Sequence, residues 1–156
     1  MTTAANDAPL VDTHAHVYTL DMPFSATAWH KPPADATIDM YVDTLAKHGV
    51  KYAVIAAASL FDDYNEYSIE ATRRHKHLRT TAIVKPTIDP YVMRMMKDDG
   101  VVGVRFQWRN VKNLPDITTP EYQKFSGACA TWTGTSTCLP RASAWPAWSR
   151  NSTRPA

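Results

Sequence analysis

The 156-residue chain lacks the features that mark several classes of protein. No apolar run approaches the roughly 20 residues that span a membrane, and residues 1–9 lack the apolar core of a signal peptide. The net charge of +2 is too small to indicate a nucleic acid or an anionic membrane as a partner. We therefore expect a cytoplasmic protein without nucleic-acid or membrane partners.

The chain is also short of the length that a complete (β/α)8 barrel needs, which is about 200 residues or more. It can still form one domain with a substantial core. Its two cysteines, Cys129 and Cys138, both fall in an unusual C-terminal stretch, so they say little about the redox compartment.

Hydrophobic patterns alternate along the chain between those typical of buried strands and those typical of amphipathic helices. We expect strands within 10–18, 52–58, 80–84 and 101–106, and helices at 38–48, 66–75 and 90–99. Polar residues that precede the second of these helices, Asp62, Asp63 and Asn65, offer N-caps rather than catalytic carboxylates. The alternation predicts an α/β fold with a parallel sheet.

The first strand carries two histidines, His14 and His16, at a spacing of i, i+2. Alternation along a strand places both imidazoles on one face, where they could hold a divalent metal without ordering a loop. The alternative is a pair of half-buried histidines bonded to the backbone. A second pair, His75 and His77, lacks a flanking apolar strand, and we reject it as a metal site.

Two cations stand at the ends of later strands. Arg105 ends the fourth strand, where a guanidinium could bind a carboxylate in bidentate fashion or form an ordinary ion pair. Lys85 ends the third strand and could neutralise a substrate carboxylate.

Several of these segments resemble the amidohydrolase superfamily. The resemblance rests on Val11-Asp12-Thr13-His14-Ala15-His16, Tyr64-Asn65, Val84-Lys85 and Gly103-Val104-Arg105-Phe106. The most similar part of the superfamily is the amidohydrolase-2 group, which contains 2-pyrone-4,6-dicarboxylate lactonase and sulfomuconolactone hydrolase. The resemblance covers about residues 9–125 and implies the N-terminal half of a (β/α)8 TIM barrel, with about four β/α units.

The resemblance also implies a function. Such proteins hydrolyse lactones or amides, here of a small carboxylated ring compound, with Arg105 and Lys85 as substrate-binding residues. His14 and His16 would be catalytic and would bind zinc or manganese, or would polarise the carbonyl directly in a lactonase that needs no metal. A third histidine and an aspartate, from the fifth and eighth strands of the family's barrel, complete its site. The alternatives are a metal-dependent decarboxylase of an aromatic acid, and an inert half-barrel that self-associates through its sheet edges.

The C-terminal stretch does not continue this pattern. We expect residues 1–8 to be a disordered lead-in, and the pattern of a helix that begins at Thr119-Pro120-Glu121 lasts to Phe125. Residues 126–156 contain no Asp, Glu, Lys or His and predict an irregular, non-native tail. A one-base shift of frame can recover a histidine-bearing strand and an amphipathic helix there. We therefore expect a frameshifted, truncated barrel without meaningful hydrolysis.

Overall fold

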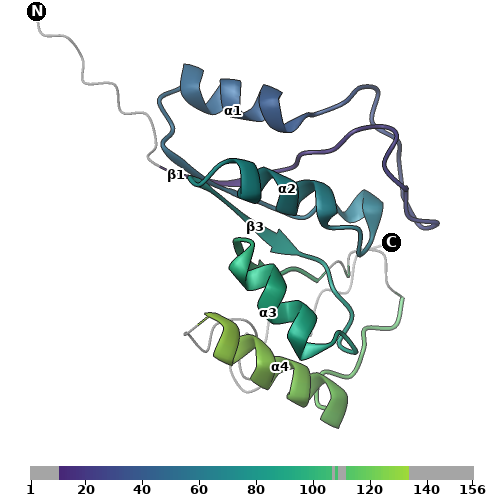
Figure 1. The fold of residues 1–156 in the computed structure, drawn as a ribbon. Helices are drawn as coiled ribbons and strands as arrows, with labels where there is room; N and C mark the ends of the chain where they lie inside the picture. The colour runs from purple at the N-terminus through teal and green to yellow at the C-terminus, as the bar shows by residue number, and fades with distance from the viewer. Residues whose placement is uncertain (1–10, 107, 109–111, 134–156) are drawn as a thin grey trace, which may run out of the picture.

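The computed structural model describes residues 11–106, 108 and 112–133 (Figure 1). Strands and helices alternate along the chain as β1 Val11–Ala15, α1 Ile38–Lys47, β2 Tyr52–Ile55, the 3-10 turn η1 Ser59–Phe61, α2 Glu66–Arg74, β3 Leu78–Ala82, α3 Pro90–Asp98, β4 Val101–Val104 and α4 Pro120–Thr133. The four strands form one parallel sheet in the order β1-β2-β3-β4. This confirms the predicted α/β fold, with the strand order of half a (β/α)8 barrel.

Local signals explain where two of the helices begin and end. The Thr37 side chain accepts a hydrogen bond from the backbone of Met40 at 3.2 Å and caps α1, and Gly49 follows the helix with φ at 68°. Asp89 caps α3 by accepting from the backbone of Tyr91 at 2.6 Å, with a proline at the first helical position. Both helices lie where the sequence predicted them.

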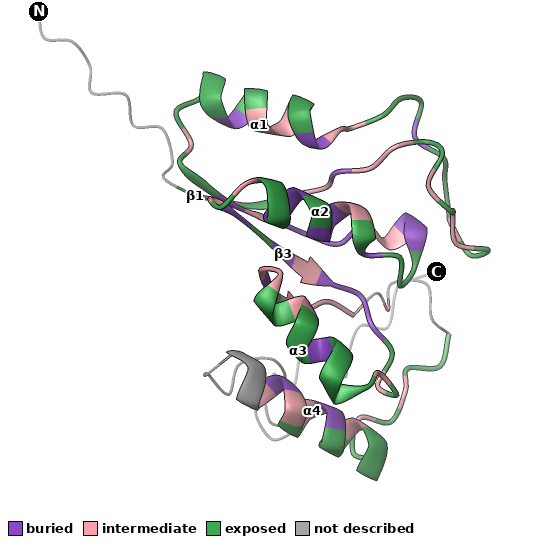
Figure 2. Cartoon of the chain, viewed as in Figure 1, coloured by how far each residue is buried: buried purple, intermediate pink, exposed green. Residues whose placement is uncertain are grey.

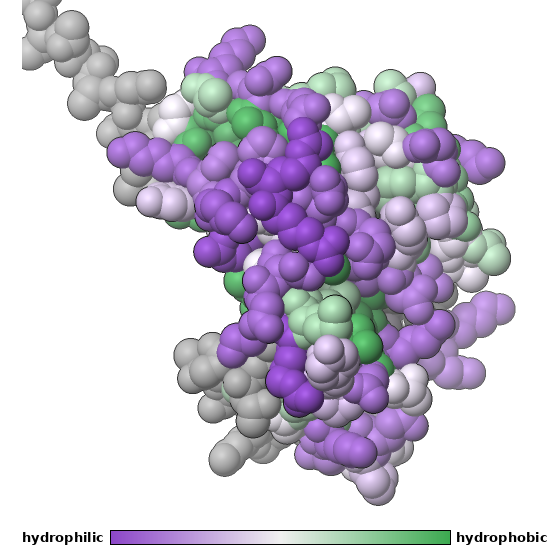
Figure 3. All heavy atoms as spheres, viewed as in Figure 1, coloured by the Kyte–Doolittle hydropathy of each residue, from purple (hydrophilic) through white to green (hydrophobic). Residues whose placement is uncertain are grey.

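The core lies between the sheet and the helices (Figure 2). Ile55, Leu78 and Val101, one from each of three strands, are almost completely buried. All three strands differ from the predicted limits, and β2 ends at Ile55, although the apolar run that predicted it continues to Ala58. The outer helix faces carry mostly hydrophilic side chains (Figure 3), and none of the described helices is long and apolar enough to cross a membrane.

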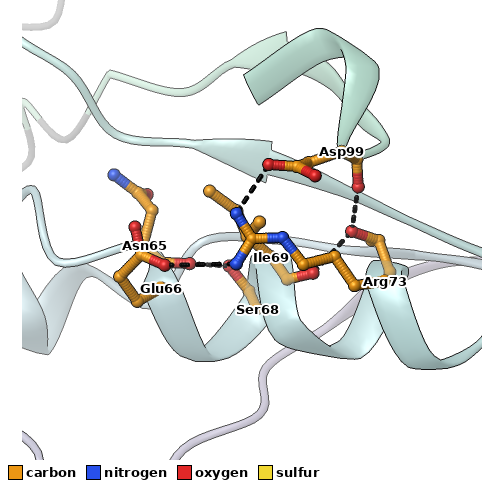
Figure 4. A network of polar contacts seen from close by, with 7 residues as sticks. Asn65, Glu66, Ser68, Ile69, Arg73 and Asp99 are labelled. Atoms are coloured by element: carbon orange, nitrogen blue, oxygen red, sulfur yellow. Dashed lines mark hydrogen bonds and ion pairs between the residues drawn. The ribbon is translucent and has the colours of Figure 1, made fainter. Parts of the chain in front are cut away.

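The end of α2 is tied to the turn before β4 (Figure 4). Arg73 pairs with the Asp99 carboxylate at 2.6 Å, and the hydrogen bond from Arg73 lowers the pKa of Asp99. The Thr72 hydroxyl lies within hydrogen-bond distance of the backbone carbonyls of Ile69 and Asp99 and can donate to either one. Gly100 has φ at +99°, and a Cβ there would come within 3.0 Å of Thr72. A glycine is therefore required where α2, α3 and β4 meet.

One prediction in this region is wrong. The helix α4 continues past Phe125 to Thr133, and Cys129 is 1% exposed and packs in the same cluster as Phe125. The i, i+4 spacing of these two residues puts both on the face that contacts α3 and β4. In α3, Met93 is buried, whereas Met95 is 49% exposed. The predictions for residues 1–8 and for the tail after Thr133 lie outside the described residues.

Candidate active site

Three of the four predicted site residues come together at the C-terminal edge of the sheet. His14 lies within β1, His16 follows the end of β1, and Arg105 follows the end of β4. The backbone N–H of Arg105 donates to Ala82 at 2.8 Å, which continues the β3–β4 pairing for one residue past β4. Parallel strands bring their carboxyl ends to one edge, so residues distant in sequence become neighbours there.

His16 is fixed by a backbone carbonyl. Its Nδ1 lies 2.7 Å from the carbonyl oxygen of Ala56. A carbonyl can only accept, so Nδ1 carries the proton and Nε2 of the neutral ring keeps a lone pair. Burial lowers the pKa of His16, and the charges of Arg105 and His14 lower it further, against the opposing effect of the Ala56 bond. His16 is therefore a neutral imidazole at neutral pH, suited to accept a proton or to bind a metal.

His14 is exposed and stands next to His16. The ring centroids are 5.2 Å apart in an edge-to-face arrangement. The backbone N–H of His14 donates to Asp12 Oδ1 at 3.1 Å, and the Tyr41 hydroxyl of α1 donates to Asp12 Oδ2 at 2.9 Å. Burial raises the pKa of Tyr41, and the bond to Asp12 raises it further. Asp12 and Tyr41 thus hold the histidine-bearing strand against α1, a positioning role that the sequence pattern did not reveal.

Arg105 is a half-buried cation. Its Nη1 donates to the carbonyl oxygen of Ala57 at 2.5 Å, and burial lowers its pKa. In the part of the chain that the structure describes, no carboxylate forms an ion pair with it. Desolvation of an unpaired charge is unfavourable, so an anion bound beside this guanidinium would be stabilised.

Lys85 stands in a different environment. Its side chain is 70% exposed and its Nζ lies 3.0 Å from a carboxylate oxygen of Asp63. The hydrogen bond to Asp63 raises the pKa of Lys85. Lys85 and Arg105 line one hollow, whose lining does not include His14 or His16. The four predicted residues thus fall into two adjoining parts: the histidine pair with Arg105, and the hollow with Arg105 and Lys85.

Asn65 does not cap α2 with its side chain, contrary to the prediction. Its Oδ1 accepts from the backbone N–H of Ile83 at 2.9 Å, and its Nδ2 donates to the carbonyls of Ile83 at 2.9 Å and Asp63 at 2.8 Å. The side chain therefore ties the start of α2 to the chain just after β3. The sequence gives no signal for a contact across 18 residues, whereas a cap is a local pattern and easier to propose.

The histidine pair offers two ligands to a metal. Among the residues that the structure describes, no three His, Cys, Asp or Glu side chains gather closely enough to hold an ion. The second histidine pair, His75 and His77, has ring centroids 5.8 Å apart and gains no third ligand either. The bond from His16 to Ala56 is the kind of outer contact that orients a metal-binding imidazole.

Comparison with known proteins places this geometry in context. No protein-family model and no curated protein matches the chain. A solved candidate 2-pyrone-4,6-dicarboxylic acid hydrolase from Acinetobacter baumannii, with citric acid bound, matches with a TM-score of 0.76 and 28% identity. The match covers 79% of this chain and 46% of that one.

A second candidate hydrolase of the same name, from Pseudomonas putida, matches with a TM-score of 0.68 and 23% identity, over 78% of this chain and 44% of its own. At that identity the likeness shows the fold alone. The chain thus spans less than half the length of these solved structures. Its four β/α units have the fold of part of a (β/α)8 barrel.

Proposed function

We propose that this chain carries the carboxylate-binding part of a hydrolase site for the lactone of a small carboxylated ring compound. The observation that carries the proposal is Arg105, a half-buried guanidinium without a carboxylate partner among the described residues, next to the histidine pair. Its remaining N–H groups can bind one substrate carboxylate in bidentate fashion. The 28% identity to a candidate 2-pyrone-4,6-dicarboxylic acid hydrolase supports this class of substrate.

The protonation of His16 limits what it can do in the reaction. Because Nδ1 donates to Ala56, a neutral His16 has no N–H at Nε2 with which to polarise a carbonyl. His16 therefore acts through its Nε2 lone pair, as a metal ligand or as an acceptor for a proton of the attacking water. The exposed His14 has no such restraint on its ring in the described structure, and it is the histidine that could donate to the lactone carbonyl directly.

A divalent metal, zinc or manganese, fits the donor atoms that are present. His14 and His16 would hold it, and when bound it would polarise the lactone carbonyl as a Lewis acid. A catalytic zinc site commonly has three protein ligands, and the described residues supply two of them. Hydrolysis adds water to the acyl carbon and breaks its bond to the ring oxygen, which leaves a carboxylate and a hydroxyl group. We expect this chain to bind the ligand without meaningful turnover, because among the described residues no third His, Cys, Asp or Glu side chain joins the pair to complete a metal site.

The test is calorimetric titration of the full chain with 2-pyrone-4,6-dicarboxylate. Arg105→Met should weaken binding by about 10- to 100-fold, since hydrogen bonds to charged groups contribute about 1.5–3 kcal/mol. Arg94→Met, at an exposed position on α3, is the matched control and should leave binding unchanged. Equal affinity of the Arg105→Met variant and the parent chain would refute the proposed role.

Metal binding and chemistry are tested separately. Equilibrium dialysis against Zn²⁺ or Mn²⁺ should show retained metal that His14→Ala and His16→Ala each reduce, while His48→Ala, at an exposed helix end, does not. Product analysis distinguishes the reactions: a ring-opened acid indicates a hydrolase, and carbon dioxide indicates a decarboxylase. Robust ring opening by the chain as it stands would contradict the expectation of inactivity.

A further inference from the structure

A hollow of about 150 Å³ lies between the segments that follow β3 and β4. Its lining includes the cations Lys85 and Arg105, the carboxylate of Asp63, and the rings of Phe106 and Trp108. An engineered cavity of about this volume accepts a benzene molecule. The hollow therefore has the size of one six-membered ring, with charged groups at its border.

The aromatic side of the hollow is supported from the core. Phe106 and Trp108 are stacked, with centroids 4.8 Å apart and planes at 24°. Phe106 is packed in turn against Phe125 of α4, in an edge-to-face contact with centroids 6.0 Å apart. This arrangement holds the two stacked rings in place, so that a flat partner could pack on them without reordering the wall.

The charged side of the hollow contains an internal carboxylate. Asp63 pairs with Lys85 at 3.0 Å, and their side chains are 48% and 70% exposed. An exposed ion pair contributes little to stability, so its exchange for a pair with a ligand carboxylate would cost the fold little. Arg105, the other cation, has no carboxylate partner among the described residues. One anion site is thus open and the second is occupied by a side chain that can leave.

We propose that Asp63 is an internal competitor in this hollow, and that Phe106 and Trp108 select for flat rings. One ligand carboxylate binds Arg105, the second displaces Asp63 from Lys85, and the ring packs against the aromatic wall. This proposal rests on the proposed function for its ligand class. It concerns only binding and specificity, so it can be tested without turnover.

The first test compares two ligands that cannot be hydrolysed and differ in planarity. The full chain is titrated by calorimetry with benzene-1,3-dicarboxylate and with cis-cyclohexane-1,3-dicarboxylate. The flat ligand should bind about three- to tenfold more tightly, in line with the strength of aromatic contacts. Trp108→Leu should remove most of this preference. Equal binding of the two ligands, or a preference that survives in the Trp108→Leu variant, would overturn the role of the wall.

The second test asks whether replacement of Asp63 tightens or weakens the binding of a dicarboxylate. Asp63→Asn should tighten binding of benzene-1,3-dicarboxylate, since the competitor is gone, while benzoate binding stays the same. Lys85→Met should weaken the dicarboxylate and spare benzoate. Asp98→Asn and Lys97→Met, exposed on α3 and absent from the hollow's lining, are the controls and should change neither. Because Asp63 is exposed, its variant keeps the test informative even where Trp108→Leu folds poorly.

The two proposals fail in different ways. Weaker or unchanged dicarboxylate binding by Asp63→Asn refutes the internal competitor, whatever Arg105→Met does. Unchanged binding of 2-pyrone-4,6-dicarboxylate by Arg105→Met refutes the proposed function, while tighter binding of benzene-1,3-dicarboxylate by Asp63→Asn would still support the competitor.

Discussion

Replacement of Asn65 by aspartate tests how the site's scaffold is held together. Asn65 is 7% exposed, and its side chain bonds the backbone of Ile83 in both directions and the carbonyl of Asp63. Asn65→Asp preserves shape and the acceptor for the Ile83 N–H, but it places a carboxylate oxygen where Nδ2 now donates to two carbonyls. The change therefore isolates hydrogen bonding and charge from packing.

The expected loss follows from these contacts. Two donor bonds disappear, and the carbonyl of Ile83 is left buried beside a negative oxygen. An unsatisfied buried group costs about 1–3 kcal/mol, and repulsion adds to it. We therefore expect the free energy of unfolding to fall by about 2–4 kcal/mol at pH 7.5, which is a large share of the roughly 5–15 kcal/mol typical of a domain.

The assay is urea unfolding followed by circular dichroism, with the m-value checked for constancy. Asn113→Asp, at an exposed position, is the control and should change stability by no more than about 0.5 kcal/mol. The pKa of the introduced carboxyl should rise on folding, above its unfolded value of about 3.9. The protonated form can again donate, so the loss should shrink as the pH falls toward 4. A loss equal to that of the control, or one that does not change with pH, would refute this account of Asn65.

Two other predictions can be checked without ligands. Burial lowers the pKa of His16, with Arg105 and His14 contributing, so nitrogen NMR should show a midpoint below the unperturbed value of about 6.5 and a proton on Nδ1. As the pH falls, His16 is protonated in the unfolded chain before it is protonated in the folded one. The free energy of unfolding should therefore decrease as the pH falls below about 6.5. Arg105→Met should raise the midpoint only in part, because burial is the larger cause; a lower or unchanged midpoint would contradict this. For the C-terminal stretch, we expect that inserting or deleting one base near the Phe125 codon of the coding DNA opens a longer reading frame. If no one-base change does so, the frameshift hypothesis fails.

The sequence predicted the elements whose signals are local. The helices α1 and α3 follow from their apolar spacing and from caps that lie within a few residues of each end. The helix α4 was harder because Gly127, Ala128 and Ala130 are small and give almost no periodic signal. Its continuation includes Cys129, which is buried where α4 contacts α3 and β4.

Contacts between distant segments explain the rest of what sequence analysis missed. Tyr64-Asn65 is one of the segments on which the resemblance rests, but the resemblance gave no role to the side-chain amide of Asn65. The ion pair between Lys85 and Asp63 was also missed, because it joins residues from different loops. Each of these contacts joins the chain just before α2 to the chain just after β3, and α2 and β3 lie side by side in the fold. Helix propensity and residue spacing contain no information about such pairs. The sequence therefore predicted only a local role for Asn65, as a cap of the nearest helix.

The predicted end of β2 was wrong at the position where the chain contacts two of the candidate site residues. The apolar run predicted a strand to Ala58, yet β2 ends at Ile55. Beyond that point the carbonyls of Ala56 and Ala57 accept from His16 of the β1 end and from Arg105 of the β4 end. Both alanines are buried, at 6% and 4% exposure, so a larger side chain at either position would disturb the packing there. The orientation of the two functional side chains is therefore set by backbone groups, which no substitution removes directly. In a strand continued to Ala58, successive carbonyls would point to opposite neighbours. Backbone N–H groups of β1 and β3 would then compete with His16 and Arg105 for the Ala56 and Ala57 carbonyls.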